Sequence, residues 1–514
     1  MKRPQLVSSN ALGRLFQAAE EARRRLDFEQ CIQTLERASR LDPANVTLLL
    51  NLGHAHGKNF NFAAAEQFFE RAIRLAPKKT DAYMAAAIRA RDFGSSLLAE
   101  RYNRLAAEQK DSPPEALIAL AENSERLSRL EEAAQFVDRA LALKPNSPEA
   151  ILIHARLERH AGRMPEAERI LRSFPGEAGR ETRVQAGYEL GGILDRQGRY
   201  DEAMSAFQNA KALLIPDAAP HIAAARKVRG QLKELREHLD PEILKRWQET
   251  GKELTPSRRL TLLCGHPRSG TTLLEQVLDS HPDIVSAEET PVFHDHAYPF
   301  LSRNAPPTAN ILSVLDTAKI EVIQEARKNY FRCMEGYLGG NLNHRLLVDK
   351  NPILTFLIVP FIRIFPETQL LVALRDPRDV CLSCFMQSLS LNQSAAAFLT
   401  LEGTVDDYAE LMTMYQSVVP LIPNKRIEVR YEDMVADLES VSRQVLEFLN
   451  VPWDERVLQF HEHARQKLVR SPTYADVTKP VFKRAVGRWH HYRKYLEPYL
   501  ENLAPFVKAF GYED

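Results

Sequence analysis

The sequence lacks most of the features that mark membrane, secreted or polyanion-binding proteins. Its 68 basic and 68 acidic side chains leave no net charge, which argues against nucleic acid or an anionic membrane as a partner. The most apolar segment, ILTFLIVPFIRIF at 353–365, contains a proline and an arginine and is too short to span a bilayer. The N-terminus shows no apolar core of a signal peptide, so we expect a reducing cytoplasm.

Cysteine is also scarce. The 5 cysteines are an odd number and form neither a disulfide framework nor a four-ligand zinc pattern. Cys381 and Cys384 make one CxxC pair, but no second pair accompanies it. We therefore interpret them as buried helix residues rather than a redox site. The HDH and HEH triplets at 294–296 and 461–463 lack the spacing of HExxH, and we predict no metal site.

A 34-residue step runs through the first half of the chain. Small residues stand at Cys31, Ala65, Ala99, Ala133 and Ala167, and prolines recur on the same step at 43, 77 and 145. Thirty-four residues suffice for two helices and two turns. The segment from about 11 to 216 resembles roughly six tetratricopeptide repeats. That resemblance implies an all-α solenoid whose groove holds a protein partner, although the array could instead dimerise or support a second domain.

The second half alternates apolar runs with helical patterns. Strands are expected at 260–265, 345–350, 370–374 and 426–431, with a further short one near 284–289. Such alternation predicts a parallel sheet covered on both faces, with ligands at the carboxyl ends of its strands. A chain of 514 residues exceeds one core. We predict a repeat array at 1–225, a capping helix and linker at 226–257, and an α/β domain at 258–514.

The turn after the first predicted strand is built to hold an anion. In GHPRSGTTLLEQVL, Gly265 and Gly270 permit tight backbone geometry, and N–H groups at the helix start form a cradle. Arg268 adds a forked cation. Thr271 stands where an ATPase loop carries lysine. No strand clearly ends in a metal-binding aspartate, and Asp376 is the nearest candidate. A degenerate P-loop NTPase is therefore an alternative, but a disfavoured one.

A second anion unit lies downstream. The run LLVALRDPRDVCLSCF places Arg375 at the end of a predicted strand and Ser383 about two turns into the next helix. An arginine and a serine in these places could grip one more phosphate. The sequence therefore predicts a ligand that carries two separated anionic groups.

The two units together resemble the 5′- and 3′-binding signatures of sulfotransferases. The residues concerned are PRSGTTLLEQVLDSHPDI…AEET and LRDPRDVCLSCF, with YEDM…FLNVPW and GRWHHY further on. The match is closest to the tyrosylprotein sulfotransferase branch and its repeat-carrying bacterial relatives. It implies a P-loop-like sulfotransferase fold with a central parallel sheet. It also implies 3′-phosphoadenosine 5′-phosphosulfate as donor, and no metal.

The resemblance also implies roles for single residues. Arg268 would stabilise the sulfuryl group, Glu289 would be the base that deprotonates the acceptor, and Lys350 would stabilise the leaving group. Glu288 is the alternative candidate for the base. Because some relatives use a histidine as the base, His294 and His296 are candidates as well. The nucleotide would be bound by residues of the first loop (Arg268, Ser269, Gly270, Thr271, Thr272) and by Arg375, Ser383, Tyr431, Thr473, Tyr474 and Lys479.

The acceptor is the least determined part of this interpretation. Transfer to a hydroxyl, such as that of a protein tyrosine, is the leading hypothesis, and a glycan or small-molecule hydroxyl is its rival. Pro291 follows EET, where the tyrosylprotein branch carries a basic residue. A scaffold with an inactive transferase domain is a further alternative, and the oligomeric state is left open.

Overall fold

The computed structural model describes residues 3–255, 257–303, 305–306, 309–340, 342, 344–466, 477–479, 481 and 484–512. Its contacts divide the chain into two compact units. The first comprises Met1–Ile153, His294–Pro299 and Asn329–Asn341; the second comprises His154–Phe293, Phe300–Lys328 and Leu342–Asp514. None of the described helices combines the length and apolar character that crossing a bilayer requires.

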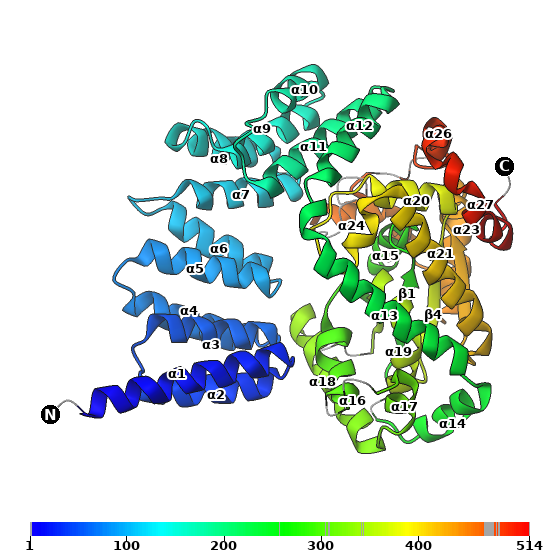
Figure 1. Ribbon diagram of the computed structural model, residues 1–514, viewed down its shortest axis with the longest axis horizontal. Coiled ribbons are helices and arrows are strands. Elements are labelled where there is room, and N and C mark those ends of the chain that lie inside the picture. The colour runs from blue at the N-terminus through cyan, green and yellow to red at the C-terminus, as the bar shows by residue number, and fades with distance from the viewer. Residues whose placement is uncertain are drawn as a thin grey trace. The chain divides into compact units, whose positions relative to one another are not determined.

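The N-terminal region is a series of helical hairpins (Figure 1). Its helices are α1 (Arg3–Arg24), α2 (Phe28–Leu41), α3 (Val46–Lys58), α4 (Phe62–Leu75), α5 (Lys79–Asp92), α6 (Ser96–Ala107), α7 (Pro114–Arg126), α8 (Leu130–Leu143), α9 (Pro148–His160), α10 (Met164–Arg172), α11 (Arg180–Arg196) and α12 (Tyr200–Ala212). The predicted all-α repeat region is confirmed.

The 34-residue period has a backbone cause. The turn within each of the first five hairpins carries a residue with positive φ, and these residues are 34 apart: Leu26, Phe60, Gly94, Ser128 and Gly162. In the first three hairpins the next residue caps the following helix, because Asp27, Asn61 and Ser95 each accept a backbone N–H. The small residues predicted at the closest helix contacts are buried. The turn, the helix cap and the close contact between helices therefore recur with the same 34-residue period.

The first unit also contains two segments from the second half of the chain. Arg332 donates to the carbonyl and side-chain oxygens of Asn59 at 3.0 and 2.7 Å. The ring of Phe60 lies 5.2 Å from His296 and 6.1 Å from Tyr337. These segments thus pack on the turn of the second repeat.

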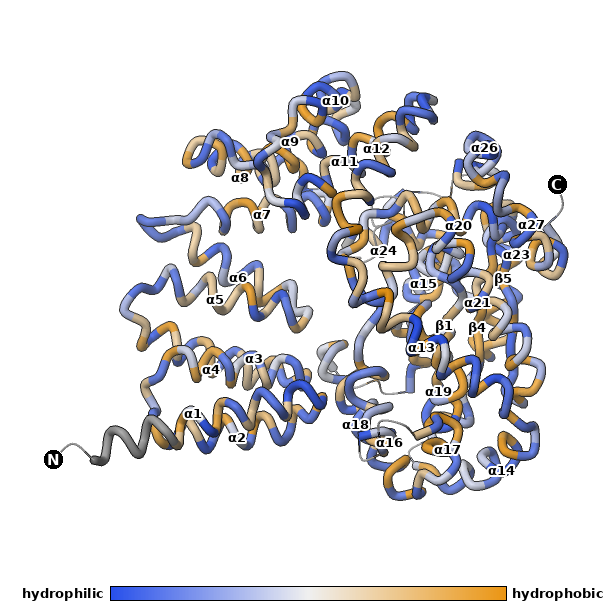
Figure 2. Tube along the Cα trace, viewed as in Figure 1, coloured by the Kyte–Doolittle hydropathy of each residue, from blue (hydrophilic) through white to orange (hydrophobic). Residues whose placement is uncertain are grey.

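The second unit is organised around a five-stranded parallel sheet. Its strands are β1 (Leu260–Gly265), β2 (Ile284–Glu288), β3 (Leu346–Lys350), β4 (Gln369–Leu374) and β5 (Arg426–Arg430), in the order β2-β3-β1-β4-β5. All five predicted strands are present, within one residue at their ends. Figure 2 shows β1 and β4 as predominantly hydrophobic, as expected of strands buried on both faces.

Helices cover this sheet and extend the unit. They are α13 (Ala219–His238), α14 (Pro241–Gly251), α15 (Thr271–Asp279), α16 (Tyr298–Ser302), α17 (Ile311–Asp316), α18 (Ile320–Leu338), α19 (Ile358–Ile364), α20 (Pro377–Phe385), α21 (Leu401–Val418), α22 (Tyr431–Ala436), α23 (Leu438–Phe448), α24 (Phe460–Gln466), α26 (Arg493–Leu496) and α27 (Leu500–Ala509). Cys381 and Cys384 are buried on α20, with free thiols. The domain boundaries at 225/226 and 257/258 stay predictions.

The last repeat packs against the C-terminal part of the same unit. Met204 and Phe207 of α12 share a hydrophobic cluster with Phe385, Trp489 and other residues of the sheet domain. Asp195, at the end of α11, accepts hydrogen bonds from Arg488 at 2.9 Å and from the hydroxyl of Tyr492 at 2.7 Å. Its side chain is 11% exposed, so this charged contact is largely shielded from water.

We predict that Asp195→Ala lowers the free energy of unfolding by about 1.5–3 kcal/mol, because it removes hydrogen bonds that a buried charge accepts. Asp201→Ala is the matched control. Asp201 also contacts the C-terminal segment, through Lys494, but is 68% exposed, and its loss should cost less than about 1 kcal/mol. Urea unfolding of both variants measures the difference; equal costs would contradict the prediction.

Candidate active site

The loop between β1 and α15 has the backbone of an anion cradle. Gly265, Arg268 and Gly270 have φ values of 135°, 72° and 96°. A Cβ atom on Gly265 would lie 2.3 Å from the carbonyl oxygen of Ala373, and one on Gly270 would lie 2.7 Å from the Tyr431 ring. Both positions therefore require glycine, and α15 begins directly after the second one.

Side chains hold this loop at both ends. The Thr355 hydroxyl accepts from the Gly265 N–H at 2.8 Å and donates to its carbonyl at 2.7 Å. Ser269 donates its hydroxyl to the His266 carbonyl at 2.7 Å. Nδ1 of His266 lies 2.8 Å from the Pro267 carbonyl oxygen, so this nitrogen carries the proton. Hydrogen bonds from residues of the loop itself, and from Thr355 outside it, thus fix the shape of the cradle.

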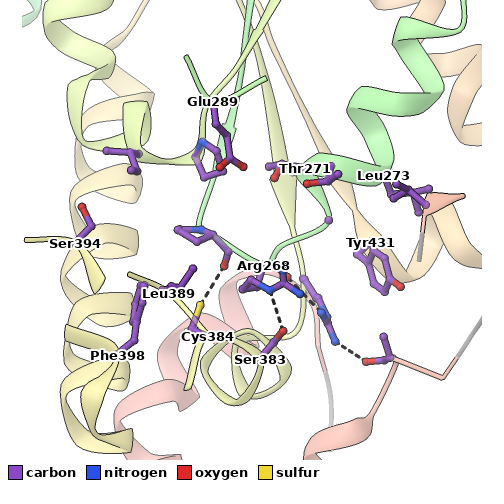
Figure 3. Close-up of a pocket in the computed structure, with 18 of the residues that line it drawn as sticks. Arg268, Thr271, Leu273, Glu289, Ser383, Cys384, Leu389, Ser394, Phe398 and Tyr431 are labelled. Carbon is purple, nitrogen blue, oxygen red and sulfur yellow. Dashed lines mark hydrogen bonds between the residues drawn. The ribbon is translucent and has the colours of Figure 1, made fainter. Parts of the chain in front are cut away.

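The loop opens into a cavity of about 360 Å³ (Figure 3). Nine of the predicted site residues line it: Arg268, Gly270, Thr271, Thr272, Glu289, Arg375, Ser383, Tyr431 and Lys479. Ser269 and Lys350 are buried next to it, at 2% and 0% exposure. Thr473 and Tyr474 lie outside the described residues.

The two predicted anion units form one pocket. Nε of Arg268 donates to the Ser383 hydroxyl at 3.1 Å, and Arg375 donates to the carbonyl of Arg268 at 3.3 Å. The Arg375 guanidinium also donates to the Ala485 carbonyl at 2.5 Å and lies 4.9 Å from the centre of the Tyr431 ring. Cations that follow two different strands therefore face a common space.

A buried charge cluster lies beside the cradle. Nζ of Lys350 lies 2.8 Å from Glu289, 3.3 Å from Glu275 and 3.5 Å from Glu288. Burial alone would lower the pKa of Lys350, but the three carboxylates outweigh it and raise that pKa above its ordinary value. The lysine therefore remains charged. It holds Glu289, whose side chain is 40% exposed, at the cavity wall.

The backbone of Glu289 is unusual. Its φ is 46°, a conformation that costs a non-glycine residue about 1–2 kcal/mol. Its N–H donates to the Lys350 carbonyl at 2.7 Å, and the Asn351 side chain donates to the Thr290 carbonyl at 3.1 Å. These bonds turn the chain at the end of β2 so that Glu289 points into the cavity (Figure 3).

The alternative bases do not line the cavity. Glu288 is 2% exposed and pairs with Lys350 across β2 and β3. His296 packs between the rings of Phe28 and Phe60 in the first unit, and burial lowers its pKa to about 4. His294 is exposed and lies 2.7 Å from Asp295, which raises its pKa. The geometry favours Glu289.

Comparison with known proteins agrees with this geometry. A model of the sulfotransferase family matches residues 261–455, and a tetratricopeptide-repeat model matches residues 16–80. The chain combines tetratricopeptide repeats with a sulfotransferase-family domain. The match to the family spans the cradle, Glu289, Lys350, Arg375, Ser383 and Tyr431.

Curated relatives are distant. An uncharacterized protein of Aquifex aeolicus is 26% identical over 388 residues, which cover 73% of this chain and 48% of that protein. Protein-tyrosine sulfotransferase A of Caenorhabditis elegans is 25% identical over 274 residues, 48% of this chain and 66% of its own length. The chain thus spans about half to two-thirds of these relatives. Among solved structures, the sulfotransferase domain of the Synechococcus PCC 7002 olefin synthase is 20% identical, with a TM-score of 0.38, and the match covers 51% of this chain and 97% of that domain.

Several residues of the sulfotransferase domain's site were not predicted. Glu275 is fully buried, accepts a hydrogen bond from the Ser286 hydroxyl at 2.8 Å and contacts Lys350. It lies four residues after Thr271, on the same buried helix face, and this spacing is the signal that could have revealed it. Arg484 and Arg488 add cations to the lining. In the described residues, no group of three or more His, Cys, Asp or Glu side chains could hold a metal ion.

We predict that Lys350→Met lowers the free energy of unfolding by about 3–5 kcal/mol, because it leaves buried carboxylates without their cation. Urea unfolding of the variant and of the original protein measures the loss.

The control for this prediction is Lys328→Met. Lys328 pairs with Glu325 at 2.9 Å but is 57% exposed, so its replacement should cost less than about 1 kcal/mol. Equal losses of stability in Lys350→Met and Lys328→Met would contradict the prediction.

Proposed function

We propose that the protein transfers a sulfuryl group from 3′-phosphoadenosine 5′-phosphosulfate to an acceptor hydroxyl. The observation that carries this proposal is that the two predicted anion units, one after β1 and one after β4, line a single cavity together with the carboxylate of Glu289. The family match and the relatives named protein-tyrosine sulfotransferases support it.

The charges of the cavity fit such a donor. In the part of the chain that the structure describes, its lining includes five cationic side chains (Arg268, Arg375, Lys479, Arg484 and Arg488) and one carboxylate, Glu289. The loop Arg268–Thr272 would bind the 5′-phosphosulfate through N–H groups at the start of α15. Arg375 and Ser383, with Tyr431 and Lys479, would bind the 3′-phosphate. Thr473, proposed for the same end of the nucleotide, lies outside the described residues.

The chemistry assigned to the residues is an in-line displacement. Glu289 accepts the proton of the acceptor hydroxyl as its oxygen forms a bond to sulfur. The bond between sulfur and the bridging oxygen of the donor breaks, and adenosine 3′,5′-bisphosphate leaves with that oxygen. Arg268 stabilises the charge on the sulfuryl oxygens. Lys350 positions Glu289 at 2.8 Å and adds positive charge behind it.

The acceptor in this proposal is a hydroxyl. A tyrosine phenol is supported by the names of the relatives, and glycan or small-molecule hydroxyls are the alternatives. The repeat array could bring a protein partner to the enzyme. A P-loop ATPase is disfavoured because Thr271 occupies the position of the catalytic lysine.

We predict that Glu289→Gln and Glu289→Ala reduce the rate of sulfate transfer by about 10²–10⁴-fold, the usual contribution of a general base. Binding of adenosine 3′,5′-bisphosphate should stay within a few-fold of the original, because the base does not touch the nucleotide in this assignment. Transfer is measured with ³⁵S-labelled donor and binding by calorimetry.

Glu447→Ala serves as control, since Glu447 is an exposed glutamate of α23 that does not line the cavity. Full transfer activity in both Glu289 variants would refute the assignment of the base. Absence of adenosine 3′,5′-bisphosphate binding in the original protein and in the control alike would refute the proposed donor.

A further inference from the structure

One wall of the cavity comes from a stretch of sequence without charge. Residues 380–401, VCLSCFMQSLSLNQSAAAFLTL, contain no Asp, Glu, Lys, Arg or His. At the chain average of 26% charged residues, a stretch of this length would carry about six charges. Half of these residues are buried, where charged side chains are rare. The exposed positions, Ser390, Asn392, Ser394 and Thr400, carry no charge either.

The uncharged stretch contributes directly to the cavity lining. Besides Ser383 and Cys384 at its start, it supplies Leu389, Ser390, Asn392, Ser394, Ala395 and Phe398. Ser390, Asn392 and Ser394 are exposed, while Ala395 and Phe398 are buried at 6% and 4%. The wall therefore combines an apolar floor with neutral hydrogen-bonding groups.

Pro352 and Ile353, which follow β3, also line the cavity. Ile353 is 48% exposed, so it offers an apolar surface that a ligand could cover. Its neighbour Asn351 donates to Thr290, directly after Glu289. The exposed apolar side chain thus belongs to the same local structure as the proposed base.

The cationic lining comes from other elements. Arg375 follows β4, while Lys479, Arg484 and Arg488 belong to the C-terminal part of the chain. In Figure 3, Leu389, Ser394 and Phe398 lie on one side of Arg268, and Tyr431 lies on the other. Among the described residues, those at 389–398 that line the cavity thus form an uncharged wall beside Arg268, on the side away from Tyr431.

We infer that the uncharged wall, formed by residues 389–398 with Ile353, binds the acceptor, and that the acceptor is an uncharged hydroxyl compound with an apolar body, such as a phenol. A tyrosine surrounded by acidic residues does not fit, because the wall offers no cation to such a peptide and Glu289 repels it. This inference rests on the proposed sulfuryl transfer and narrows its acceptor.

The direct test compares 2-naphthol with a peptide whose single tyrosine is flanked by glutamates. The full-length protein and labelled donor are used, and kcat/KM is measured for each acceptor. We expect 2-naphthol to be preferred by about tenfold or more, as one unpaired charge in a neutral pocket would produce. Equal or better use of the acidic peptide overturns the inference.

Binding separates failure of this inference from failure of the proposed function. The transferase proposal fails if the protein does not bind adenosine 3′,5′-bisphosphate, whichever of the two compounds receives sulfate. Calorimetry on the complex with adenosine 3′,5′-bisphosphate still decides which compound the wall binds. Heat from 2-naphthol and none from the acidic peptide supports the inference, whereas binding of the acidic peptide alone, or of neither compound, overturns it.

A charge placed on the wall provides the reciprocal test. Ser394→Lys should raise kcat/KM for the acidic peptide relative to 2-naphthol by about tenfold, because it supplies the missing cation. Ser417→Lys adds the same charge at an exposed position of α21 outside the cavity and should leave the ratio unchanged. An unchanged ratio in Ser394→Lys, or an equal change in both variants, contradicts the placement of the acceptor on this wall.

Discussion

The parallel pairing of β1 with β3 and β4 is the constraint on which the site depends. Leu263 pairs with Lys350, and Gly265 pairs with Ala373, so all three strands end at the same edge of the sheet. Residues about 80 to 110 positions apart in the chain are thereby brought to one cavity. The close approach of Gly265 to the Ala373 carbonyl leaves no room for a side chain between the two anion units.

A second constraint is electrostatic. Lys350 is fully buried among three carboxylates, of which two are themselves buried. Desolvating such a cluster costs several kcal/mol per ion, and this cost is offset only when the charges are closely paired. Replacing all the charged residues of the cluster with well-packed hydrophobic residues would typically give equal or greater stability. The cluster fits a functional need, because it fixes a carboxylate of unusual backbone conformation at the cavity wall.

Much of this architecture could be predicted from sequence, for identifiable reasons. The repeats follow from a fixed spacing of small residues, and the five strands follow from short apolar runs. The two anion units were predicted because Arg268 and Arg375 each stand directly after such a run. Each of these patterns lies within a short stretch of sequence, so it can be recognised without knowledge of the tertiary contacts.

Features that depend on packing were missed. No residue pattern near Glu289 predicts its positive φ. This conformation is held by the hydrogen bond from the Glu289 N–H to Lys350 and by the hydrogen bond from Asn351 to Thr290. The contact of Asp195 with Arg488 joins residues 293 positions apart. The association of residues 294–299 and 329–341 with the first repeats likewise follows from tertiary contacts around Phe60. The uncharged stretch at 380–401 was visible in the sequence, but only the cavity lining gives it a meaning.

The central claim is that two strand-end units hold the two ends of one nucleotide, and calorimetry with adenosine 3′,5′-bisphosphate and 5′-AMP tests it most directly. The original protein should bind the bisphosphate about 10–100-fold more tightly, the value of a charge-assisted contact to the 3′-phosphate. In Arg375→Ala that preference should disappear while the affinity for 5′-AMP is retained. Equal affinities in the original protein, or tighter binding of ATP with Mg²⁺ than of the bisphosphate, would contradict the account.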